Sequence, residues 1–218
     1  MKLNHDDMVA NILAYYDSAS EAQKAEGRNW YSVAGGIVAT IAKATGTQEN
    51  RVAYALAALS PRNPWRWNVF DAYSYAAARA EGRTMPKATT FKRNQLNAWQ
   101  ALAQDGQPWV SAAPKVRAFV AAILGDETAV VVDTWAYRVA TLRKPSNVVR
   151  PNEYGPIAHA YNIAANLRGE APAHMQAIVW VVAVTEGLAS HRTGRHDLAF
   201  KAGTPEWLKA ALASDSIA

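Results

Sequence analysis

Apolar side chains recur at helical spacing along almost the whole chain, and β-branched residues run together only once. That run, Val130 to Val132, is three residues long, and an isolated run of this length cannot build a sheet. Alanine and other strong helix formers fill the segments between short polar breaks. The sequence therefore predicts an all-α fold, a compact array of about ten helices of ordinary length.

The expected helices cover residues 6–25, 30–45, 48–59, 65–80, 91–102, 114–125, 133–143, 157–167, 174–188 and 205–212. Gly27 is expected to end the first helix and Thr47 to cap the third. The residues between 143 and 157 are expected to form a loop. Pro61 and Pro64 lie too close together for a continuous helix, so the segment around them is expected to be a turn or extended.

The length of 218 residues favours one domain, or two lobes around one cleft, with lobes of approximately 28–110 and 111–218 plus the N-terminal helix. The formal charge of +5 favours a polyanionic partner. Because the chain has no cysteine, it has no disulfide, no cysteine-ligated zinc or iron–sulfur cluster and no sulfur nucleophile. The five histidines lack metal-ligand spacing, so no cofactor is expected.

The first residues lack the basic and apolar regions of a secretion signal. The longest apolar stretch, Ala177 to Val184, is far too short to cross a bilayer. We therefore expect a cytoplasmic protein with no membrane partner.

Lys115 and Asp133 each stand at the start of an expected helix, and the apolar run AVVV lies between those helices. This layout can place an amine and a carboxylate at the mouth of one cleft. There an amine can act as a nucleophile and a carboxylate can stabilise a cationic transition state. The alternative is structural, since solvated lysines and aspartates that cap helices are both common.

The segment from Lys115 to Arg138 resembles the catalytic stretch of the helix-hairpin-helix DNA glycosylase superfamily. In that stretch a lysine opens one helix, and a V-D-T-H-like element followed by an arginine opens the next, as in VDTWAYR here. The separation of Lys115 and Asp133 also matches that of the bifunctional members. The resemblance implies a two-lobed helical fold of this type, DNA as partner, Asp133 and Lys115 as catalytic residues, and an extruded base held in a pocket.

A closer likeness is to glycosylase-like proteins of tailed phages, which implies the host cytoplasm as the location. It rests on motifs that occur in the same order: Trp30-Tyr31, Ala58-Leu59-Ser60-Pro61, Trp65, Asn68, Lys115, Val132-Asp133, Trp135 and Arg138.

The candidate base pocket contains residues of the proline-interrupted segment and one tryptophan after Asp133: Ser60, Asn63, Trp65, Asn68 and Trp135. The candidate contacts to the DNA backbone are Arg62, Arg117 and Arg138. A structural turn is the alternative for Ser60, Arg62 and the two asparagines. For Arg138 the structural alternative is an ion pair with Asp133 or a neighbouring carboxylate. Gln176 and Trp180 share one helix face, where we expect core packing; the alternative is that they border the pocket.

Three functions remain open. The first is cleavage of the N-glycosidic bond of a modified or mismatched base, and the second is a phage transferase acting on a hypermodified thymine in DNA. The third is a non-catalytic DNA-binding or host-interaction module. It is motivated by Ser111 and Ala113, which stand where the family has its hairpin glycines.

Overall fold

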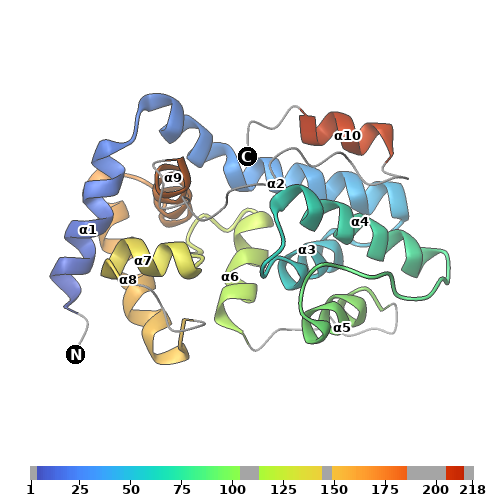
Figure 1. Ribbon diagram of the computed structural model, residues 1–218. Coiled ribbons are helices and arrows are strands. Elements are labelled where there is room, and N and C mark those ends of the chain that lie inside the picture. The colour runs from blue at the N-terminus through green and yellow to red at the C-terminus, as the bar shows by residue number, and fades with distance from the viewer. Residues whose placement is uncertain (1–3, 104–112, 144–148, 186–204, 214–218) are drawn as a thin grey trace. The chain divides into compact units, whose positions relative to one another are not determined.

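The structure, a computed structural model, describes residues 4–103, 113–143, 149–185 and 205–213. These residues form ten helices and no strand, so the all-α prediction is confirmed for them (Figure 1). The helices are α1 (His5–Ser18), α2 (Glu21–Thr45), α3 (Glu49–Leu59), α4 (Trp65–Ala80), α5 (Lys92–Ala101), α6 (Pro114–Ile123), α7 (Thr134–Thr141), α8 (Pro151–Arg168), α9 (Pro172–Thr185) and α10 (Glu206–Ala213).

The chain divides into two compact units, each of which takes residues from two separate parts of the sequence. Unit 1 comprises Met1–Ser32 and Ala113–Gly194, and unit 2 comprises Val33–Ala112 and Arg195–Ala218. The division falls inside α2, between Ser32 and Val33. The C-terminal residues, which we expected to belong with the lobe starting near residue 111, are grouped with unit 2.

Unit 1 is built around α1, which packs against α7, α8 and α9 (Figure 1). Its core is a cluster of mostly aliphatic side chains that includes Ile12, Val139, Ile157 and Ile178, each fully buried. The run Val130–Val132 is also buried and leads directly into α7. The hydroxyl of Tyr154 in α8 donates to the carbonyl of Val130 (2.7 Å). This bond holds the segment before α7 against α8.

Gly27 does not end a helix, contrary to the sequence prediction. The first helix ends at Ser18, and Gly27 lies inside α2. A Cβ atom at Gly27 would lie 2.5 Å from the Cα of Ile178 in α9. Close packing of two helices therefore explains this glycine, because a larger residue would force the two backbones apart.

Two other expected helix starts are wrong. Helix α8 begins at Pro151 rather than near Ile157. Proline is favoured at the first helical position because its missing N–H needs no partner there, and Glu153 accepts from the backbone N–H of Arg150 (3.0 Å). Helix α3 is capped at Gln48, whereas the hydroxyl of the expected cap residue, Thr47, accepts a bond from Thr45 (3.0 Å).

In unit 2, α3 packs against both α4 and α5. Helix α3 is the central element because all seven residues from Val52 to Leu59 other than Tyr54 are buried. Helix α10 contributes Trp207, whose ring meets that of Tyr73 in α4 edge-on with centroids 5.5 Å apart. Among the described helices of both units, none is long and apolar enough to cross a membrane.

Candidate functional site

Asp133 caps helix α7 through one of its two carboxylate oxygens. Its Oδ1 accepts from the backbone N–H groups of Trp135 (2.9 Å) and Ala136 (2.8 Å). The residue has the extended backbone typical of a helix N-cap. Both capping bonds go to Oδ1, so Oδ2 lies outside the cap. The structural role considered for Asp133 is therefore present, and it occupies only half of the carboxylate.

Lys115 lies in the first turn of α6, directly after Pro114. Lys115 as a whole is half-buried. Desolvation lowers the pKa of its amine below the ordinary value of 10.5, and the negative charge of Asp133 partly opposes this shift. The two expected catalytic groups thus belong to one unit and lie close enough for their charges to interact. A lowered pKa increases the neutral fraction of an amine, and the neutral amine is the nucleophilic form.

The charge of Asp133 acts on three tyrosines, none of which is titrated near neutral pH. Burial, and then the charge of Asp133, raises the pKa of Tyr31 and of Tyr161 well above 10. Burial also raises the pKa of Tyr154 to about 12, with Asp133 acting in the same direction. Their hydroxyls therefore remain protonated donors.

The Tyr31 hydroxyl donates to Oε1 of Gln176 (2.5 Å), which joins α2 to α9. Gln176 is 4% exposed, as expected for core packing, and it also has a defined hydrogen-bond partner. Trp30, next to Tyr31, meets Phe119 of α6 and Trp180 of α9 with centroids 6.0 and 5.8 Å apart. The sequence motifs include Tyr31 together with Lys115 and Asp133 but assign it no role beside them. The hydrogen bond joins residues 145 positions apart, and no local pattern indicates it.

The two expected DNA contacts in unit 1 are Arg138 on α7 and Arg117 on α6. The guanidinium of Arg138 lies 5.0 Å from the centroid of the Trp135 ring, and within the described residues it forms no ion pair with a carboxylate. The ion pair considered for Arg138 is thus replaced by a stack on Trp135. Trp135 itself packs partly against the core of unit 1. Arg117 is exposed on α6, and its charge acts on the pKa of Tyr154.

The remaining expected pocket residues lie in unit 2. The Ser60 hydroxyl donates to the carbonyl of Ala57 (2.9 Å), which is a structural bond at the end of α3. Asn63 donates through Nδ2 to Oδ2 of Asp71 (3.0 Å), so its Oδ1 is the atom that faces away from that carboxylate. Oδ1 of Asn63 and Oδ1 of Asn68 are both buried without a hydrogen-bond partner in the described part of the chain.

Trp65, the first residue of α4, is partly exposed. Arg62 is exposed in the turn between α3 and α4, with a left-handed backbone (φ 58°). Asn68 is only 1% exposed, so of these three residues it is the least accessible to a ligand.

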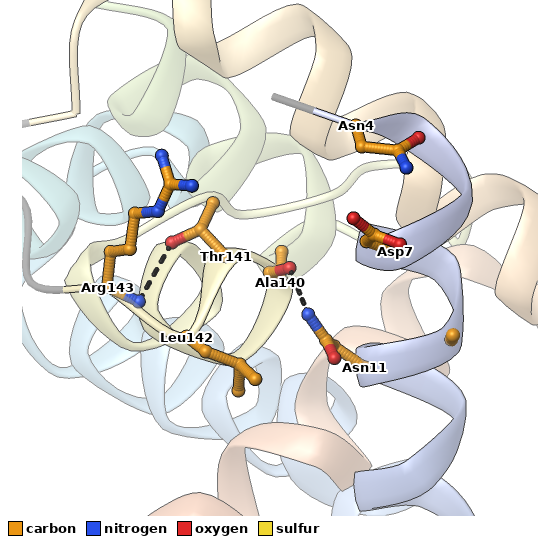
Figure 2. A pocket seen from close by; sticks show the side chains of 8 residues that line it. Asn4, Asp7, Asn11, Ala140, Thr141, Leu142 and Arg143 are labelled. Atoms are coloured by element: carbon orange, nitrogen blue, oxygen red, sulfur yellow. Dashed lines mark hydrogen bonds between the residues drawn. The ribbon is translucent and has the colours of Figure 1, made fainter. Parts of the chain in front are cut away.

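A separate hollow of about 290 Å³ lies between the start of α1 and the end of α7. Figure 2 shows Asp7 and Asn11 of α1 facing the residues that end α7. Asn11 donates to the carbonyl of Ala140 (3.0 Å). Asp133 is at the opposite end of α7, so this hollow is not formed by the Lys115 and Asp133 side chains. No group of three His, Asp or Glu residues suited to a metal ion occurs within the described ranges.

These features define an all-helical protein with a desolvated lysine beside a helix-capping aspartate in one of its two units. The chain belongs to a protein family: the family of unknown function DUF7178 matches residues 1–187. That match covers the whole described part of unit 1 and, in unit 2, the part from Val33 to Ala112, which holds α3, α4 and α5. Comparison with curated proteins and with solved structures gave no match.

Proposed function

We propose that the protein is a DNA-base-acting enzyme of glycosylase type, with the helix-hairpin-helix glycosylase fold and with Lys115 and Asp133 as its catalytic residues. The observation that carries the proposal is the lowered pKa of the Lys115 amine next to the Asp133 carboxylate. Desolvating a lysine amine costs free energy, and lysines with a lowered pKa are concentrated at functional sites. An amine with increased neutral fraction is what attack on a sugar carbon requires.

In the proposed reaction, Lys115 Nζ attacks C1′ of the target nucleotide. The C1′–N bond breaks, and its electron pair leaves with the base, which takes up a proton. The positive charge that develops on the sugar is stabilised by the Asp133 carboxylate. Because Oδ1 is fixed by two backbone N–H groups, the carboxylate needs little reorganisation as the charge appears. The attached nitrogen then loses a proton, and its lone pair forms a C1′=N bond as the C1′–O4′ bond breaks and O4′ takes up a proton. The covalent product is a protonated Schiff base between Lys115 and the opened sugar.

The base must leave the duplex stack before C1′ becomes accessible. Trp135, with Arg138 stacked on it, supplies an aromatic surface two residues after Asp133. Arg117 and Arg138 supply positive charge on α6 and α7 for the DNA backbone, and Arg62 is the candidate backbone contact in unit 2. The candidate base-pocket residues of unit 2 are Ser60, Asn63, Trp65 and Asn68.

Borohydride trapping tests the proposal, because it reduces a Schiff base to a stable amine. The protein is incubated with a panel of oligonucleotides carrying damaged, mismatched or hypermodified bases, and the adduct is mapped by mass spectrometry. We expect the adduct on Lys115, its loss in Lys115→Met, and its retention in Lys24→Met, which removes a lysine of the same unit that pairs with Glu21. Free base without an adduct would restrict Lys115 to a non-covalent role.

The same samples separate the other two functions. A transferase keeps the base–sugar bond, so nucleoside mass spectrometry would show a base of altered mass and no abasic site. A binding module would leave every oligonucleotide unchanged. Either result would contradict the glycosylase proposal.

A further inference from the structure

The positive charge of the protein is concentrated in unit 2. The described residues of unit 2 carry ten Lys and Arg side chains and four Asp and Glu side chains, whereas those of unit 1 carry eight and ten. A net charge of +5 for the whole chain conceals this division. A polyanion is therefore attracted to unit 2 more strongly than to the unit that contains Lys115 and Asp133.

Part of this charge forms a basic–aromatic patch, defined by Arg62, Phe91, Lys92 and Arg93. The Arg62 guanidinium lies 4.9 Å from the centroid of the Phe91 ring. Phe91 is 50% exposed, although it is among the largest apolar residues. The side chains of Lys92 and Arg93 follow it in the first turn of α5 and are exposed. An open aromatic ring with one cation over it is thus followed directly in the chain by two more exposed cations.

Two hydrogen bonds fix the turn after α3 to the residues around the start of α5. The Thr90 hydroxyl donates to the carbonyl of Pro61 (2.8 Å), and Asn94 donates to the carbonyl of Ala58 (2.8 Å). Thr90 is buried. The fold therefore fixes the two backbone segments that carry the patch relative to each other.

The patch is unfavourable in the protein alone. Lys92 and Arg93 lie at the positive end of the α5 dipole, where cations are destabilising, and the first turn of α5 has no acidic residue. Within the described residues, none of Arg62, Lys92 and Arg93 forms an ion pair with a carboxylate. A bound anion would offset this local repulsion, and a flat ring would cover the exposed face of Phe91.

We propose that the basic–aromatic patch binds single-stranded nucleic acid. Arg62, Lys92 and Arg93 contact phosphates, and the Phe91 ring stacks with an unpaired base. Sequence-independent single-strand binding uses this combination of cations along the backbone and aromatic rings under the bases. A duplex would offer its phosphates but no open base face. The proposal rests on the proposed function for its partner class, yet it does not require the chemistry at Lys115 and Asp133.

Fluorescence anisotropy with two labelled oligonucleotides of equal length tests the patch. One has mixed sequence, and the other has the same backbone with abasic sites throughout. Phe91→Leu is expected to weaken binding of the mixed-sequence strand about five-fold or more and to leave binding of the abasic strand unchanged. The double variant Lys92→Gln/Arg93→Gln is expected to weaken both and to reduce the slope of log K against log salt by about 1.4, or about 0.7 for each lost phosphate contact.

Arg83→Gln is the matched control, because Arg83 is an exposed cation of the same unit that is ion-paired with Glu81. If the double variant changes the affinity and salt slope no more than Arg83→Gln does, or if the wild type fails to bind the mixed-sequence strand, the patch is not a nucleic-acid site. If Phe91→Leu weakens both strands equally, the stacking role is wrong. If the wild type binds the mixed-sequence strand but gives no borohydride-trapped adduct with any oligonucleotide, the result counts against the glycosylase proposal and not against the patch.

Discussion

Asp133 combines a helix cap with a charge next to Lys115, and two substitutions can separate these roles. Asparagine caps helices about as well as aspartate, whereas alanine does not cap them. Both substitutions remove the attraction between the carboxylate and the Lys115 amine, so that contribution cancels when the two variants are compared. What differs between them is the pair of hydrogen bonds to Trp135 and Ala136.

An N-cap is worth about 1 kcal/mol, so Asp133→Ala should be less stable than Asp133→Asn by about that amount. For a chain of this size the difference in Tm is about 2–4 °C. Against the wild type, Asp133→Asn should lose only the attraction between the carboxylate and the helix dipole, about 0.3–1 kcal/mol, together with the attraction for Lys115. Thermal and urea unfolding followed by circular dichroism measure these differences.

Both variants should lose borohydride trapping to a similar extent, although only Asp133→Ala loses the cap. Equal stability of the two variants would refute the capping role of Oδ1. Trapping by Asp133→Asn at the wild-type rate would instead show that the negative charge plays no part in the reaction.

Three further outcomes follow from the structure. Gly27→Ala should be strongly destabilising because its Cβ would lie 2.5 Å from the α9 backbone. Gly36→Ala lies in the same helix, and its Cβ would have no neighbour within 4 Å, so it should raise the free energy of unfolding in urea by about 0.5–1 kcal/mol. In competitive acetylation across pH, Lys115 should titrate below an ordinary lysine, and lower still in Asp133→Asn; an unchanged pKa in that variant would rule out the interaction of the two charges. The Glu170 carboxylate has a lowered pKa despite the opposing effect of burial, because of its hydrogen bonds. The ionised Glu170 carboxylate therefore stabilises the fold above pH 4.5, and this stabilisation is lost as pH falls through the lower pKa of the folded state. Glu170→Gln should be less stable than the wild type at neutral pH, and its free energy of unfolding should fall less on acidification.

Helical periodicity was sufficient to predict the all-α class and the approximate positions of most helices. The errors came from treating glycine and proline as local signals. Gly27 is explained by a contact with Ile178, which is 151 positions away, and such a contact leaves no trace in the neighbouring sequence. The sequence prediction places Pro151 in a loop, but a proline also suits the first position of a helix.

The candidate site was predictable only where its residues are close in sequence. Lys115 and Asp133 begin consecutive helices, and a short connection between helices limits how far apart their starts can lie. Tyr31, Tyr154 and Tyr161 reach the same carboxylate from distant segments, and their contribution required the fold. The charge division also required it, because each unit combines two separate parts of the chain.

Helix capping and catalysis by Asp133 are compatible because they make different demands on the carboxylate. The cap requires one oxygen at a fixed distance from two backbone N–H groups, and Oδ1 meets that requirement. Stabilising a cation requires negative charge held in a fixed direction within a poorly solvated site. The capping bonds supply the fixed direction, and the neighbouring Lys115 amine is the group that is desolvated. A side chain that caps a helix is therefore already partly organised for electrostatic catalysis, and its capping bonds are no argument against a functional role.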